Sequence, residues 1–178
     1  MEVPRVPLRL ITDDGWTLDE SVESDIDQLM KWFPDTASID IWGGPHFRHP
    51  FTRHSFSEDL YWGRMASFSL RDPVGAFAAF GQIYERTGCI NLARLVASPA
   101  MRGQGVGRRL VDVLMTVGQS MFACPKFSLF VYRDNTPAYE CYTSMGFVVT
   151  KYPDDVVLAE VCDYLTRPVG NLENANAS

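Results

Sequence analysis

The sequence lacks the long hydrophobic runs and paired cysteines that mark several common classes of protein. No stretch among its 178 residues approaches the run of about 20 apolar residues that a membrane-spanning helix needs. No apolar run follows the N-terminus as a signal peptide would require. The four cysteines lie far apart and form no C-x-x-C pair, unlike a disulfide framework or a zinc site. We therefore expect a reduced, cytoplasmic protein with no membrane partner and no bound metal.

Clusters of basic residues are also missing. The net charge is −6, and no basic arm or Lys/Arg-rich run is present. Nucleic acids bind through clustered cations, so we expect no nucleic-acid partner. The charge is nevertheless unevenly distributed: residues 12–62 hold 11 acids and three bases, a net −8, whereas residues 85–133 hold seven bases and two acids, a net +5. A basic middle within an acidic chain indicates an anion bound locally.

The composition, 46% hydrophobic and 21% charged, is that of a globular domain. Its patterns predict strands at 8–11, 65–70, 75–84, 89–98, 127–132, 147–151 and 156–164, and helices at 21–32, 106–121 and 137–145. Prolines and glycines break any period from 33 to 56, so we expect an irregular but aromatic-rich segment there. This order predicts an α+β fold in one domain, 1–169, followed by a flexible tail at 170–178.

A glycine-rich turn between a predicted strand and a predicted helix carries the clearest chemical signal. Arg102-x-x-Gly105-x-Gly107 follows the strand and opens the helix. Successive backbone N–H groups in such a turn, together with the helix N-terminus, form a site for a pyrophosphate. A dinucleotide-binding G-x-G-x-x-G starting at Gly103 would need glycine at 108, where Arg108 stands, and a Walker Gly-Lys-Ser/Thr is absent.

A second element follows about 30 residues later, Asn135-x-x-Ala138-x-x-x-Tyr142-x-x-x-Gly146-Phe147. With the first element and Pro99 before it, this spacing resembles that of the GNAT superfamily of N-acetyltransferases. The resemblance covers residues 64–151, expected to form the acetyl-CoA core, and reaches the acceptor-side region 12–62 only in outline. It implies an enzyme that uses acetyl-CoA as co-substrate. It also implies a mixed, largely antiparallel sheet of about seven strands, splayed at the cofactor site and flanked by about four helices.

The resemblance assigns roles residue by residue. The turn would hold the CoA pyrophosphate, and the strand before it would bind pantetheine and the thioester carbonyl through its backbone. The implied cofactor-binding residues are Leu95, Val96, Ala97, Arg102, Gly103, Gln104, Gly105, Val106, Gly107, Arg108 and Asn135. Asn135 could equally cap the following helix. Tyr142 would protonate the leaving thiolate, with Tyr139 as the alternative acid and a core aromatic as the alternative role for Tyr142.

Several residues stay open at this level. No acid lies on the two strands expected to splay, so the general base could be any of Glu58, Asp59, Glu85, Asp134 and His54. Arg94 is unusual beside an acetyl donor; it either binds a carboxylate on the acceptor or points outward. The histidines His46, His49 and His54 match no metal-ligand spacing. The loop aromatics Trp42, Phe47 and Phe51, with Gly43-Gly44, either wall the acceptor pocket or form a buried cluster.

The leading interpretation is direct transfer of an acetyl group to the amine of a small molecule or peptide, by an enzyme that could form a homodimer. The alternatives are a non-catalytic acyl-CoA sensor on the same fold and a protein-interaction module that uses the aromatic loop. The acidic 12–62 region predicts a preference for cationic amines. A preference for acidic amines would instead point to Arg94.

Overall fold

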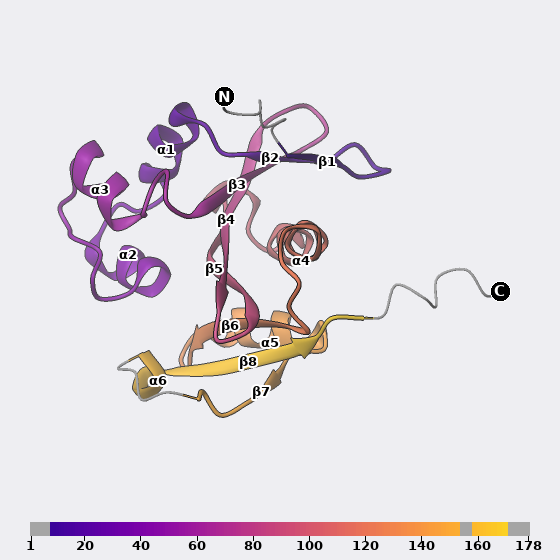
Figure 1. The fold of residues 1–178 in the computed structure, drawn as a ribbon. Helices are drawn as coiled ribbons and strands as arrows, with labels where there is room; N and C mark the ends of the chain where they lie inside the picture. The colour runs from indigo at the N-terminus through magenta and orange to yellow at the C-terminus, as the bar shows by residue number, and fades with distance from the viewer. Residues whose placement is uncertain (1–7, 154–157, 171–178) are drawn as a thin grey trace, which may run out of the picture.

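The computed structural model describes residues 8–153 and 158–170. Within them one eight-stranded sheet runs in the order β1-β2-β3-β4-β5-β6-β8-β7 (Figure 1). Its strands are β1 Arg9–Ile11, β2 Thr17–Glu20, β3 Ala66–Arg71, β4 Phe77–Arg86, β5 Cys89–Ala97, β6 Lys126–Tyr132, β7 Val148–Val149 and β8 Cys162–Pro168. The helices are α1 Glu23–Met30, α2 Thr36–Gly43, α3 Arg53–Asp59, α4 Val106–Met121, α5 Thr136–Ser144 and α6 Leu158–Val161, with a 3-10 turn η1 at Pro99–Met101.

Antiparallel pairing joins every pair of neighbouring strands except one. The turn between β3 and β4 is fixed by Asp72, whose carboxylate accepts the backbone N–H groups of Val74 and Ala76. The exception is β5 with β6, which run parallel and pair only at Ile90–Phe127 and Asn91–Ser128. Beyond Asn91 the two strands diverge. The predicted α+β fold, with a mixed and largely antiparallel sheet splayed between two central strands, is confirmed.

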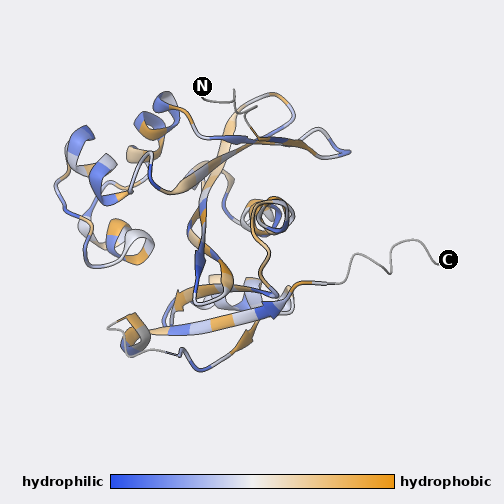
Figure 2. Ribbon diagram, in the orientation of Figure 1, coloured by the Kyte–Doolittle hydropathy of each residue, from blue (hydrophilic) through white to orange (hydrophobic). Residues whose placement is uncertain are grey.

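Helices cover the two faces of the central strands and enclose two hydrophobic cores. In Figure 1, α4 lies on one side of β4 and β5, and α1, α2 and α3 lie on the other. The apolar stripe of α4, which includes Val106, Leu110 and Leu114, packs on β4 and β5 and forms part of the first core. The second core is largely aromatic and includes Phe33, Phe56 and Phe80. In Figure 2, α3 is almost entirely hydrophilic, so a single buried residue, Phe56, anchors it to that core.

Two predictions about local structure are wrong. The segment expected to be irregular contains α2 and α3, whose N-termini are capped by Asp35 and Thr52 respectively. The last strand begins at Cys162 rather than at 156 and runs to Pro168, and α6 precedes it. The first two residues of the predicted strand, 156–157, and all but the first residue of the predicted tail 170–178 lie outside the described residues. The short strand β2 was also not anticipated.

All four cysteines are free in the structure. No helix among the described residues has the length and apolar character needed to cross a bilayer.

Candidate active site

The divergence of β5 and β6 opens a cavity of about 750 Å³. Helices α2, α5 and α6 complete its walls. The cavity brings Leu95 of β5 together with Asn135 and Tyr142 of the second motif, whereas no residue of the Arg102–Gly107 turn lines it. Residues from the N-terminal part of the chain line it as well, among them Trp42 and Tyr61. Donor-side and acceptor-side residues therefore share one space.

The edge of β5 that faces β6 offers unpaired backbone groups to this cavity. Strand pairing with β6 ends at Asn91, whereas β5 continues to Ala97. On its other edge β5 remains paired with β4, with a bulge opposite Gly81 at which Arg94 adopts a positive φ of 50°. A strand edge with free N–H and C=O groups can accept an extended ligand as an extra strand. Leu95 lines the cavity and, like Ala97, packs against the first core, whereas Val96 packs against the second.

The glycine turn follows directly. After η1 the chain passes through Arg102 to Gly103 and Gly105, whose φ angles of +74° and +77° favour glycine. Gly107 is different, because it lies in regular helix and a Cβ there would meet nothing within 4 Å. Neither backbone conformation nor packing within the described chain therefore requires glycine at 107. A close external ligand would explain it, and no side chain caps the first N–H groups of α4.

The arginines around the turn have different surroundings. Arg102 is exposed, and no hydrogen bond or ion pair joins it to another described residue. Arg108 donates to the Ser144 hydroxyl at 2.9 Å and so links α4 to α5. Arg109 forms an ion pair with Asp14 at 2.7 Å and lies over the Trp16 ring. Gln104 donates weakly to the Ala100 carbonyl at 3.4 Å, and the side chain of Val106 is buried in the first core.

Asn135 caps a helix, as its sequence context allowed, and its contact with the cofactor stays a prediction. Its side-chain oxygen accepts the Ala138 N–H at 3.4 Å and caps α5, and the residue also lines the cavity.

Tyr142 is half-buried in the cavity wall, and its hydroxyl has no hydrogen-bond partner among the described residues. Burial, with a smaller contribution from Cys141, raises the pKa of the Tyr142 phenol above its ordinary value. The phenol therefore keeps its proton throughout the neutral range. Tyr139, the alternative acid, packs against the first core and does not line the cavity.

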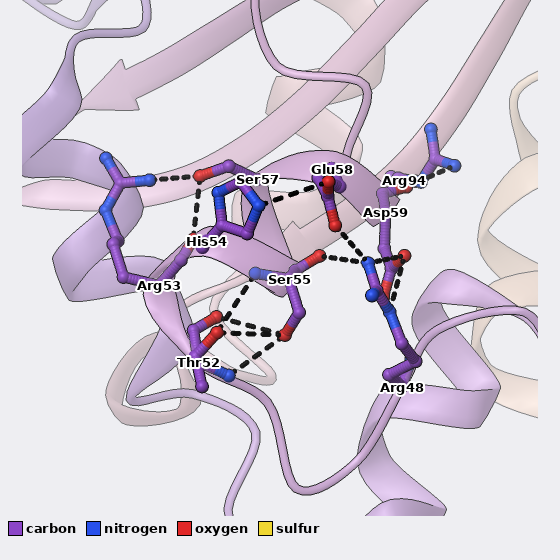
Figure 3. Close-up of polar contacts among 9 residues, drawn as sticks. All are labelled: Arg48, Thr52, Arg53, His54, Ser55, Ser57, Glu58, Asp59 and Arg94. Atoms are coloured by element: carbon purple, nitrogen blue, oxygen red, sulfur yellow. Dashed lines mark hydrogen bonds and ion pairs between the residues drawn. The ribbon is translucent and has the colours of Figure 1, made fainter.

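None of the five candidate bases lines this cavity. Arg48 holds the carboxylates of Glu58 and Asp59, each at 2.8 Å (Figure 3). Hydrogen bonds from Arg48 lower the pKa of Glu58, and they lower that of Asp59 despite its burial. His54 pairs with Glu58 at 3.2 Å.

The remaining two candidates also lie elsewhere. Glu85 lines a second cavity of about 580 Å³, and Asp134 is exposed.

The structure draws attention to a different histidine. His46 lines the cavity, and a neutral imidazole can accept a proton. Sequence reasoning considered His46 only as a metal ligand, and its position at the cavity could not be read from spacing. His49 lies elsewhere, with its Nδ1 at 3.1 Å from the Thr36 hydroxyl. Trp42 and the two glycines after it line the cavity, and Trp42 also packs against the second core. Phe47 and Phe51 belong to that core and do not line the cavity.

A β-strand that splays from its parallel neighbour, followed by a glycine turn that opens a helix, defines a class of acyl-CoA-dependent transferase. The sequence pattern of the Acetyltransferase (GNAT) family matches residues 26–147. The chain belongs to this family, as its two motifs predicted, and the family is one of N-acetyltransferase enzymes.

Individual relatives are distant. A stretch of 67 residues is 30% identical to the N-acetyltransferase 9-like protein of Nematostella vectensis, covering 38% of this chain and 33% of that relative. The chain thus aligns with about a third of the relative's length. The spermidine N-acetyltransferase of Vibrio cholerae, solved with CoA and spermine, superposes with a TM-score of 0.67 at 13% identity, covering 88% of this chain and 96% of the other. An uncharacterized protein from Bacillus halodurans gives a TM-score of 0.70 at 13% identity, covering 91% and 90% respectively.

Proposed function

We propose that this protein transfers an acetyl group from acetyl-CoA to an amine that binds in the cavity between β5 and β6. The observation that carries the proposal is the arrangement of that cavity. The free edge of β5 and the unpartnered Tyr142 hydroxyl face the same space. A protein that only bound an acyl-CoA would need the strand edge but would have no use for a phenol at the leaving group.

The donor would bind along the path that these features outline. The first N–H groups of α4, Gly103, Gly105 and the exposed Arg102 would hold the pyrophosphate, because a helix N-terminus and a cation both favour an anion. The free edge of β5 at Leu95 would hold the pantetheine arm and direct a backbone N–H at the thioester oxygen. Family members of known structure are consistent with this, since the Vibrio cholerae enzyme was solved with CoA.

The transfer itself would proceed by direct attack. The nitrogen of the free amine attacks the thioester carbon, a C–N bond forms, and the C–S bond breaks. The departing thiolate takes the phenolic proton of Tyr142, and the amine's proton passes to His46, the base that the cavity offers. Burial raises the pKa of Tyr142, and a thiolate released into the same cavity is desolvated too, which raises the pKa of its thiol in the same direction.

A thiol-release assay tests the proposal. Purified protein is mixed with acetyl-CoA and a panel of amines, and free thiol is followed over time. We expect Tyr142→Phe to lower kcat by about 10²–10⁴-fold, the range for a lost acid–base group, with the affinity for CoA retained. Tyr139→Phe is the matched control on the same helix and should leave kcat nearly unchanged. Tight binding of acetyl-CoA without thiol release for any amine would favour the non-catalytic sensor instead.

A further inference from the structure

The wall of the active-site cavity contains two cations. Arg86 and Arg94 both line it, and no Asp or Glu is among the described residues that do so. This is unexpected in a chain of net charge −6. The two arginines differ in how their donors are used.

Arg86 forms a hydrogen bond and ring contacts with neighbouring side chains. Its Nε donates to the Tyr152 hydroxyl at 2.7 Å, and its guanidinium lies over the rings of Phe130 and Tyr152. Arg86 therefore braces the wall of the cavity.

Arg94 also lies over two aromatic rings, those of Phe47 and Tyr61, and hydrogen bonds hold it in place, but no carboxylate neutralises it. One terminal nitrogen donates to the Gln82 side-chain oxygen at 2.7 Å, and the other donates to the backbone carbonyl of Asp59 at 3.3 Å. The Gln82 amide nitrogen donates to Leu60 and Ser67, which fixes its oxygen toward Arg94.

No carboxylate among the described residues pairs with Arg94. The nearest candidate, Asp59, turns its carboxylate toward Arg48, while the Arg94 guanidinium lies on the other side of the Asp59 backbone (Figure 3). Burial lowers the pKa of Arg94 from its ordinary value, yet arginine remains charged in proteins. A largely buried cation without a counter-ion is unfavourable unless a ligand supplies the anion.

Two buried N–H donors in the same cavity wall lack acceptors. The Nε of Arg94 and the Nε1 of Trp42 are both inaccessible to solvent and have no hydrogen-bond partner among the described residues. Both atoms are closed off from the cavity as well, so a ligand could accept from them only if the side chains shifted, and the inference depends instead on the missing counter-ion of Arg94. A carboxylate in the cavity would supply that missing negative charge.

The place of Arg94 in the chain limits which carboxylate can reach it. It directly precedes Leu95, where the proposed function locates the thioester, and the bulge turns its side chain into the cavity. An anion bound by Arg94 would therefore lie close to the thioester, and an amine that reaches the thioester would have to be close to that anion.

We propose that the acceptor is a free amino acid, whose carboxylate is bound by Arg94 while its neighbouring amine attacks the thioester. This inference rests on the proposed function. A peptide N-terminus carries an amide in place of that carboxylate and would leave Arg94 unpaired. The aromatic and aliphatic wall, which includes Ile41, Trp42 and Phe130, suits an apolar side chain.

The test compares L-phenylalanine with L-phenylalaninamide, two probes that differ only in the carboxylate. The amide's amine is the weaker base and is more deprotonated at neutral pH, so intrinsic reactivity favours the amide. We expect kcat/KM for wild type to favour the amino acid by about 10–100-fold, as for a hydrogen bond to a charged group. In Arg94→Gln this preference should disappear while CoA affinity, measured by calorimetry, is retained. In Arg86→Gln, the matched control, the preference should remain.

Each outcome bears on the inference. Equal rates with both probes, or a preference for the amide or for spermidine, would overturn it and leave the acetyltransferase proposal intact. Loss of the preference in both arginine variants would overturn the specific role of Arg94. Failure of wild type to bind acetyl-CoA would reject the proposed function and this inference together. If Arg94→Gln does not fold, the rise in wild-type Tm given by each probe in the presence of CoA decides, and it should be larger for phenylalanine.

Discussion

Replacing Gly107 by glutamate should make the free protein more stable and its complex with CoA weaker. A Cβ at this position meets nothing within 4 Å, and the backbone is regular helix, so the substitution introduces neither a clash nor strain. Gly105 is a poorer choice for the same test, because its φ of +77° would strain any other residue.

The gain in stability follows from the position of Gly107 in the first turn of α4. Glycine is about 1 kcal/mol less favourable than alanine in a helix, and a carboxylate near a helix N-terminus contributes a further ~0.3–1 kcal/mol. We expect the free energy of unfolding to rise by about 1 kcal/mol, which for a chain of this size raises Tm by about 2–4 °C.

The loss of affinity follows from the charge. At an effective dielectric constant of about 20, two unit charges separated by about 4 Å interact with about 4 kcal/mol. The new side chain can turn partly away, so we expect CoA affinity to fall by about 10–100-fold. Gly107→Gln has the same length without the charge and is the matched control. The difference between the two variants should shrink as salt is added.

Calorimetry of CoA binding and thermal unfolding of the free protein measure the two effects separately. If Gly107→Glu bound CoA as tightly as wild type, the pyrophosphate would not lie at this turn. If its Tm fell instead, the claim that nothing in the chain requires glycine at 107 would be wrong.

Two further predictions concern proton transfer and stability. Because the raised pKa of Tyr142 keeps its phenol protonated, kcat/KM should climb with pH as the amine loses its proton and should show no descending limb below about pH 10. His46→Gln should lower kcat/KM by about 10²–10⁴-fold, the range for a lost acid–base group, and an unchanged kcat/KM would remove His46 as the base. Asp25, 1% exposed, accepts from Arg71, Ser69 and the Val22 backbone, so Asp25→Ala should lower the free energy of unfolding in urea by about 3 kcal/mol. Asp27→Ala removes a carboxylate that is 61% exposed and pairs with Arg53, and should cost less than about 1 kcal/mol; equal losses would contradict the reasoning.

The sequence predicts those parts of the fold whose signals are local and long. The helix expected at 106–121 is α4 with the same bounds, because a single apolar stripe spans its 16 residues. By contrast, α2 and α3 have seven or eight residues each, and prolines and glycines surround them. Those residues are boundaries of the helices: Pro34 precedes the cap at Asp35, and Gly43 ends α2. The capping signals are present in the sequence, but with serine at the third helical position, where glutamate or glutamine is the usual indicator.

The residues of the candidate site likewise fall into those that local sequence signals predict and those that they do not. The glycine turn and the Asn135–Tyr142 element are contiguous in sequence, so their residue types and spacing predict them together. The acceptor side is assembled from single residues of separate elements, such as His46, Tyr61, Arg86 and Arg94. No spacing rule connects such residues, and only the tertiary structure shows that they share a cavity.

The acidic region 12–62 illustrates why net charge is a weak guide to a binding site. Its carboxylates largely pair with arginines inside or outside the region or cap helices, as Asp59 does with Arg48, Asp14 with Arg109, and Asp35 at the start of α2. None of them lines the cavity, whereas two arginines from β4 and β5 do. A charge that is already paired contributes little to the potential that a substrate meets, but an unpaired buried charge contributes strongly. The cation preference that we expected from the sequence therefore depends on charges that lie away from the cavity, and the unpaired charge of Arg94 favours a carboxylate.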